Sequence, residues 1–142
     1  MGGTVLLVGR VLFSFFFIYS GFNHLTKLRM MAGYAAASGV PAPTVAVAVT
    51  GVILLAGGLS ILLGVRPKIG AILLFVFLVP TAFMVHKFWG IADPMMAANQ
   101  AAHFWKNITL AGAALMIYAV ADLYPARWPF SLGGAAPRAP VI

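Results

Sequence analysis

Two short segments hold most of the side chains of this chain that could take part in chemistry. They are "HKFW" at 86–89 and its near anagram "HFWKN" at 103–107, and a third histidine is His24. Imidazole, ammonium and amide groups can donate hydrogen bonds to a ligand, and imidazole can also bind a metal. The only two acidic residues are Asp93 and Asp122. The chain therefore offers few side chains for acid–base catalysis.

Several cofactors can be weighed against these residue types. The chain contains no cysteine, which excludes a thiolate nucleophile, an iron–sulfur cluster and a cysteine-held zinc within it. The histidines lack a short His-x-x-His spacing, so no metal site is predicted. Haem held by His86 and His103 is an open but unsupported alternative.

A quinone head group, or another small lipophilic ligand, suits these segments better. Such a ligand needs an aromatic slot with one or two hydrogen-bond donors. The alternative is that the lysines and aromatic residues only anchor helix ends at the lipid head groups. The candidate ligand-binding residues are His86, Trp89, His103, Trp105, Lys106 and Asn107.

The composition indicates that these residues are carried by membrane helices. Hydrophobic residues make up 63% of the 142 residues and charged residues only 8%, with a mean hydropathy of +1.03. A soluble domain carries about 25% charged residues, so the expected partner is the lipid bilayer. The net charge of +7 comes from single basic residues between apolar runs. Nucleic-acid binding is therefore excluded.

Four segments are long and apolar enough to span a bilayer, which needs about 20 residues each. The sequence predicts an all-α integral membrane four-helix bundle as one domain over residues 1–124, followed by a Pro/Gly/Ala-rich tail, 125–142, which we expect to be disordered. An even number of spans brings both termini to one side, and Arg10 favours the cytoplasm for them. The same topology puts all three histidines at the opposite face. The predicted spans are about 4–25, 43–64, 69–88 and 102–123.

Helical periodicity predicts which face of the first span points inward. At about 100° per residue, one line of this helix collects side chains that are polar or small apart from one aromatic ring. They are Arg10, Ser14, Phe17, Gly21 and His24. We expect Arg10, Ser14 and His24 to be structural polar residues that face the bundle. In the second span, Ala56, Ser60 and Gly64, with Gly57 beside them, predict a close helix contact.

The chain resembles the DoxX-like family of small bacterial inner-membrane proteins over about residues 8–120. The likeness rests on "GRVLFSFFFIYSGFNHL" at 9–25, "GVP" at 39–41, "GGLSILLG" at 57–64 and "HFWKN" at 103–107. It implies a four-helix bundle in the bacterial inner membrane and an association with quinone or redox chemistry. Some relatives are named as parts of thiosulfate:quinone oxidoreductases. Many relatives carry a glutamate where this chain has Leu54, so a catalytic role that depends on that acid does not carry over.

Three functions are consistent with these observations. The leading hypothesis is a non-catalytic membrane subunit or anchor that serves protein partners in a larger assembly, with a redox complex as one candidate. The alternative is a quinone-binding oxidoreductase subunit that holds its ligand near His86 and His103. The third is a small transporter or channel. Its path would have to use the few polar residues within the spans, namely Arg10, Ser14, Thr50, Ser60 and Thr81.

Overall fold

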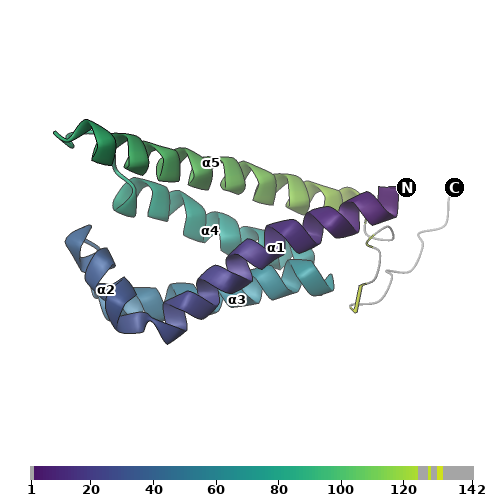
Figure 1. Ribbon diagram of the computed structural model, residues 1–142. Coiled ribbons are helices and arrows are strands. Elements are labelled where there is room, and N and C mark those ends of the chain that lie inside the picture. The colour runs from purple at the N-terminus through teal and green to yellow at the C-terminus, as the bar shows by residue number, and fades with distance from the viewer. Residues whose placement is uncertain (1, 125–127, 129–130, 133–142) are drawn as a thin grey trace, which may run out of the picture.

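Long helices dominate the computed structural model, which describes residues 2–124, 128 and 131–132. The helices are α1 (Gly2–Thr26), α2 (Leu28–Ala37), α3 (Pro43–Leu63), α4 (Pro67–Val85) and α5 (Pro94–Leu123). Helices α1, α3, α4 and α5 are long and apolar enough to cross a membrane. The predicted all-α bundle of four membrane helices is thus confirmed, and α2 is a short additional helix between the first two spans (Figure 1).

The boundaries of the last two spans differ from the prediction, each for a local reason. Helix α4 ends at Val85, so "HKFW" follows the helix instead of closing it. Helix α5 begins at Pro94, eight residues before the predicted start at 102. Asp93 explains this early start, because its side chain accepts a hydrogen bond of 2.7 Å from the backbone N–H of Met96 and so caps the helix.

Two helix pairs form the bundle and separate at one end. Helix α1 packs along α3, α4 packs along α5, and α3 joins the two pairs through α4. Figure 1 shows the pairs close together where α1 begins and diverging toward the end that carries α2. That divergence leaves room between the pairs at the α2 end.

The buried face of α1 is the one that the periodicity predicts. Its buried residues are Arg10, Ser14, Phe17, Gly21 and His24, which are the five residues of the predicted line. Close approach explains Gly21, because a Cβ atom there would lie 2.8 Å from the carbonyl oxygen of Gly51 in α3. The inward orientation of this stripe is confirmed.

The small-residue contact of α3 runs through Gly57 of the predicted set and through its neighbour Gly58, and not through Ala56. Ala56 is exposed, whereas Gly57 and Gly58 are buried. A Cβ atom on Gly57 would lie 2.7 Å from Leu74 of α4, and one on Gly58 would lie 2.8 Å from Ile18 of α1. Adjacent glycines therefore let α3 approach both neighbours, one on each side.

Arg10 closes the C-terminal end of α3. Its Nε donates to the carbonyl of Ile61 at 3.0 Å, and its Nη2 donates to the carbonyl of Leu62. The guanidinium carbon also lies 5.1 Å from the centre of the Trp128 ring. Last-turn carbonyls of a helix lack partners within the helix and carry the negative end of its dipole. We call this arrangement of Arg10, Ile61, Leu62 and Trp128 the Arg10 cap.

The predicted tail, 125–142, lies outside the described residues except for three positions. Trp128 is buried, Ser131 donates from its hydroxyl to the carbonyl of Gly64 at 2.8 Å, and the N–H of Leu132 donates to the carbonyl of Leu63 at 2.9 Å. These three residues pack on the end of α3, contrary to the expectation of a disordered tail at their positions.

Candidate functional site

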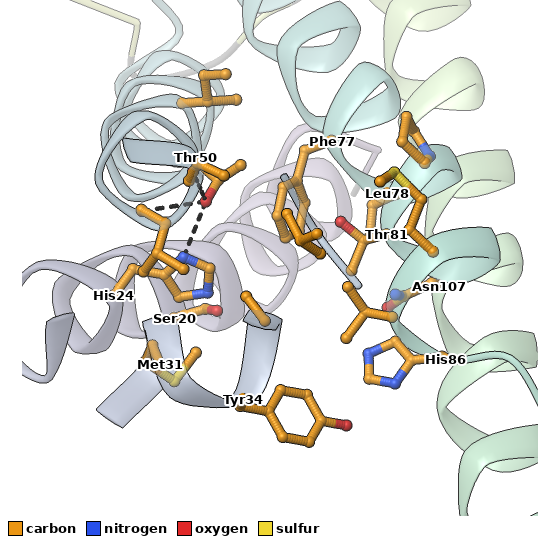
Figure 2. A pocket seen from close by; sticks show the side chains of 18 of the residues that line it. Ser20, His24, Met31, Tyr34, Thr50, Phe77, Leu78, Thr81, His86 and Asn107 are labelled. Carbon is orange, nitrogen blue, oxygen red and sulfur yellow. Dashed lines mark hydrogen bonds between the residues drawn. The ribbon is translucent and has the colours of Figure 1, made fainter. Parts of the chain in front are cut away.

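A cavity of about 530 Å³ lies between the two helix pairs at the α2 end. This volume is within the range of about 300–1,000 Å³ that is typical of small-molecule sites. Most of its lining side chains are aliphatic, aromatic or methionine, and its described lining residues include no acid. We call it the histidine cavity (Figure 2). Its polar or charged lining residues are Ser20, His24, Tyr34, Thr50, Thr81, His86, His103, Lys106 and Asn107.

One wall of the histidine cavity is formed by α1 and α3. His24 is 9% exposed, and its Nδ1 lies 3.1 Å from the hydroxyl oxygen of Thr50. The same hydroxyl oxygen lies 2.8 Å from the carbonyl oxygen of Ala46, to which it donates. Figure 2 shows His24 and Thr50 together on one side of the cavity, with His86 and Asn107 on the other side.

His86 stands on the opposite wall, directly after the end of α4. Its Nδ1 lies 2.9 Å from Oε1 of Gln100 in α5, and Nε2 of Gln100 donates to the hydroxyl of Tyr34 in α2 at 3.1 Å. Gln100 thus joins α2 to the end of α4 across the cavity. Burial lowers the pKa of His86, the hydrogen bond with Gln100 opposes that shift, and the charge of Lys106 adds to it. The neutral imidazole is therefore favoured at neutral pH.

Helix α5 contributes His103, Lys106 and Asn107 to the same wall. The rings of His86 and His103 stack with centres 5.1 Å apart and an interplanar angle of 21°. Nζ of Lys106 lies 3.2 Å from Nδ1 of His103 and 5.2 Å from the centre of the Phe16 ring in α1. Asn107 is 5% exposed, and no described residue hydrogen-bonds to its amide.

The structure brings four of the six predicted ligand residues into one cavity. His86, His103, Lys106 and Asn107 line it, and Trp89 and Trp105 do not. The two indoles are 52% and 59% exposed and pack around Phe104, with ring centres 5.9 and 5.2 Å from it. They belong to an outward-facing aromatic cluster because "HKFW" leaves the helix after Val85 and carries Trp89 away from the cavity.

His24, predicted as a structural polar residue, also lines the histidine cavity. Sequence reasoning missed Tyr34, Thr50 and Ser20 as members of the site. Tyr34 lies on α2, which no predicted span included, and Thr50 is a single hydroxyl in an apolar span. The four-residue spacing of Ser20 and His24 in α1 was the one available signal.

The residues that the structure describes do not group three or more metal-ligating side chains in an arrangement that could hold an ion. The core of the bundle contains fully buried apolar side chains of α1, α3 and α4. They are Phe17, Leu54, Leu74 and Leu78, and of these four Leu78 lines the cavity. Leu54 is thus part of the apolar core.

Fold and site together define a class of protein, the small multi-pass membrane helical bundle with an apolar cavity between its spans. A family match then specifies it further: the DoxX family model matches residues 5–87, more than half of the chain. The chain therefore belongs to the DoxX family, as the resemblance predicted.

A curated relative supports the same assignment. The chain is 28% identical over 114 residues to "Inner membrane protein YphA" of Escherichia coli (strain K12), across 80% of this chain and 81% of the relative. No solved structure matches the chain. With four spanning helices and an inner-membrane relative, the predicted multi-pass inner-membrane location is confirmed. The cytoplasmic placement of the termini stays a prediction.

Proposed function

We propose that this protein binds a small lipophilic molecule with an oxygen-bearing ring as its head group, of the quinone class, in the histidine cavity. The observation that carries the proposal is an apolar cavity of about 530 Å³ with Asn107 on its wall, a residue only 5% exposed whose amide hydrogen-bonds to no described residue. A buried polar group costs free energy unless it finds a hydrogen-bond partner. A ligand with an oxygen-bearing head group supplies that partner, and the aliphatic walls suit its apolar body.

The inner-membrane location supports this choice, because a lipophilic ligand dissolved in the bilayer can reach a cavity between membrane helices. Lys106 of α5 and Phe16 of α1 meet across the gap between their helices at 5.2 Å, and these helices do not pack extensively along each other within the described residues. We expect the ligand to enter from the bilayer between α1 and α5.

A matched pair of variants in α3 tests the proposal. Ala46 lines the cavity, whereas the adjacent Val45 is 63% exposed, toward lipid. A decyl-substituted benzoquinone is titrated against purified protein in lipid nanodiscs. Ala46→Phe fills the cavity and should weaken binding at least about tenfold, the effect of roughly 1.4 kcal/mol, while Val45→Phe should bind as the wild type does. Absence of saturable binding to the wild type would refute the proposal.

A second candidate, a membrane subunit that holds a protein partner, is favoured by the length of α5. Its 30 residues extend about 45 Å, longer than the hydrocarbon core of about 30 Å. The side chains at its start, Met95 and Met96, are 81% and 61% exposed, and methionine adapts readily to partner surfaces.

Introducing negative charge on that surface tests the second candidate. The double substitution Met95→Glu and Met96→Glu should release any protein that co-purifies stoichiometrically with the wild type in mild detergent. Met116→Glu, at a site 71% exposed in the spanning part of α5, is the control for general damage. A stoichiometric partner that the double variant still retains would contradict this candidate.

A further inference from the structure

The hydrogen bonds of Thr50 determine which nitrogen of His24 carries the proton. The Thr50 hydroxyl has a single hydrogen, and its shortest contact is the carbonyl oxygen of Ala46 at 2.8 Å. With its hydrogen donated there, the hydroxyl oxygen can only accept from Nδ1 of His24 at 3.1 Å. A neutral His24 then carries its proton on Nδ1.

The other ring nitrogen, Nε2, is consequently a hydrogen-bond acceptor. A neutral imidazole has one N–H and one lone pair, so the proton on Nδ1 leaves the lone pair on Nε2. His24 lines the histidine cavity and is only 9% exposed. Besides Thr50, the backbone of Val47 is hydrogen-bonded to the ring. Within the described residues, Nε2 makes no hydrogen bond to a side chain, and Figure 2 shows the ring bordering the cavity. This position calls for a ligand that donates a hydrogen bond.

His103 has the opposite polarity on the other wall. Its Nδ1 lies 3.2 Å from Nζ of Lys106, and an ammonium group has hydrogens but no lone pair. Nδ1 of His103 therefore accepts, and its Nε2 carries the hydrogen. Together with the ammonium of Lys106, His103 supplies donors for a ligand oxygen. His86 on the same wall donates from Nδ1 to Oε1 of Gln100, so its Nε2 is an acceptor, as Nε2 of His24 is on the other wall.

We infer that the histidine cavity selects the reduced, hydroxyl-bearing form of its ligand, a quinol over the corresponding quinone, and that His24, held by Thr50, is the specificity-determining residue. The inference rests on the proposed function. A quinol hydroxyl can donate to Nε2 of His24, and its second oxygen can accept from the opposite wall. A quinone has only carbonyl oxygens there, which accept, so it would leave His24 unpaired or force Thr50 to give up its bond to Ala46.

Competition between the two redox forms tests the inference in the whole protein. A decyl-substituted benzoquinone and its hydroquinone, the latter kept reduced under argon, are titrated separately against protein in nanodiscs. The wild type should bind the hydroquinone about tenfold more tightly, the discrimination expected from one hydrogen bond made or lost in a buried site. Equal affinities, or tighter binding of the quinone, would overturn the inference and leave the proposed function standing. No saturable binding of either form would refute the proposed function itself.

Two variants attribute the preference to its residue. Thr50→Val removes the hydroxyl that fixes His24, so the hydroquinone preference should fall to about twofold or less. Thr81→Val removes another hydroxyl of the cavity, one with no hydrogen bond to a histidine in the described residues, and should keep the full preference. A Thr50→Val protein with the wild-type preference would overturn the inference.

Nitrogen-15 NMR gives a ligand-free measurement that does not depend on the stability of any Thr50 variant. Histidine-labelled wild-type protein, with the His24 signals identified by their absence in His24→Gln, should show the proton of His24 on Nδ1. A proton on Nε2 in the unliganded protein at neutral pH would overturn the inference.

Discussion

The two ends of the bundle use buried polar groups in opposite ways. At the Arg10 cap, the guanidinium donates to the carbonyls of Ile61 and Leu62 and lies over Trp128, so its hydrogen bonds hold the fold together. In the histidine cavity, among the described residues, the amide of Asn107 has no hydrogen-bond partner and Nε2 of His24 makes no hydrogen bond to a side chain. On the Arg10 side, the buried Oγ of Ser14 and Nε1 of Trp128 also lack a hydrogen-bond partner within the described residues. The contrast therefore concerns Arg10, whose donors bind backbone carbonyls, and the cavity side chains, which face an open volume.

This difference follows from how the helices meet. Near the Arg10 cap, the two helix pairs lie close together (Figure 1). Within one of them, the guanidinium on α1 reaches backbone carbonyls at the end of α3. At the α2 end, the pairs diverge and side chains face an open volume of about 530 Å³. Substitutions at the Arg10 cap should therefore change stability, and substitutions in the cavity should change binding.

Arg10→Met should have the largest effect on stability. It removes donors from two carbonyls at the end of α3 and should lower the free energy of unfolding by about 2–4 kcal/mol, since buried acceptors lose charged partners. Equilibrium unfolding in mixed detergent micelles measures this. Ligand affinity of the folded fraction should not change.

Arg10→Lys is the control for charge at this position. It keeps a cation but cannot reproduce the planar fork of the guanidinium. Its free energy of unfolding should therefore lie between those of the wild type and Arg10→Met. A loss below about 1 kcal/mol for Arg10→Met would show that the cap does not stabilise the bundle as we argue.

Gly21→Ala should have the next largest effect, and it should reach both regions. The added methyl would lie 2.8 Å from the carbonyl oxygen of Gly51, and separating α1 from α3 should cost about 1–3 kcal/mol. Because His24 lies one turn further along α1, the separation should also lengthen its contact with Thr50 and weaken ligand binding.

Gly33→Ala in α2 is the matched control, because nothing lies within 4 Å of a Cβ atom at Gly33. It should leave stability unchanged or raise it by up to about 1 kcal/mol, as alanine favours the helix. If Gly21→Ala and Gly33→Ala change the unfolding free energy by the same amount, the close approach of α1 and α3 at Gly21 is not the cause of the destabilisation.

The sequence predicted the Arg10 region better than the histidine cavity, and the reason is the range of the interactions. The buried line of α1 repeats with the helix period, so Arg10, Ser14 and His24 could be placed inward from their spacing alone. The Arg10 contacts with Ile61 and Leu62, in contrast, depend on where α3 ends beside α1, and no local pattern encodes that.

The cavity depends on tertiary geometry even more strongly. Tyr34 meets Gln100, 66 positions away in the chain, and this contact exists only because α2 folds back over the end of the bundle. Trp89 does not line the cavity because α4 ends at Val85, three residues before the predicted end, and Trp105 lies on an exposed side of α5. A small error in a helix end changes the direction in which every following side chain points.

Lowering the pH should destabilise the protein through His86 in the histidine cavity. The loss of unfolding free energy should be smaller than that caused by Arg10→Met or by Gly21→Ala. The pKa of His86 is lowered in the folded protein by burial, with Lys106 adding to the shift and Gln100 opposing it. A histidine with a lowered folded pKa binds fewer protons than the unfolded chain does. Stability should therefore be constant above about pH 7 and fall as the pH drops below the unfolded value of about 6.5.

His86→Gln isolates this contribution, since the other titratable neighbours of His86, namely Tyr34, His103 and Lys106, remain. The difference between the unfolding free energies of wild type and variant should depend on pH below about 6.5 and be flat above it. If the stability of the wild type relative to the variant instead falls as the pH rises through about 6.5, the folded state favours the charged imidazole.

Asn107→Leu should have the smallest effect on stability and the clearest effect on function. Asn107 is 5% exposed, and its amide makes no hydrogen bond to a described residue. Replacing it by an apolar side chain of similar size should therefore change the unfolding free energy by less than about 1 kcal/mol, in either direction. Binding of the decyl-substituted benzoquinone should nevertheless weaken, because the ligand loses the partner that the cavity holds for it. A marked destabilisation with unchanged binding would mean that Asn107 serves the fold as Arg10 does, and the contrast between the two ends would not hold.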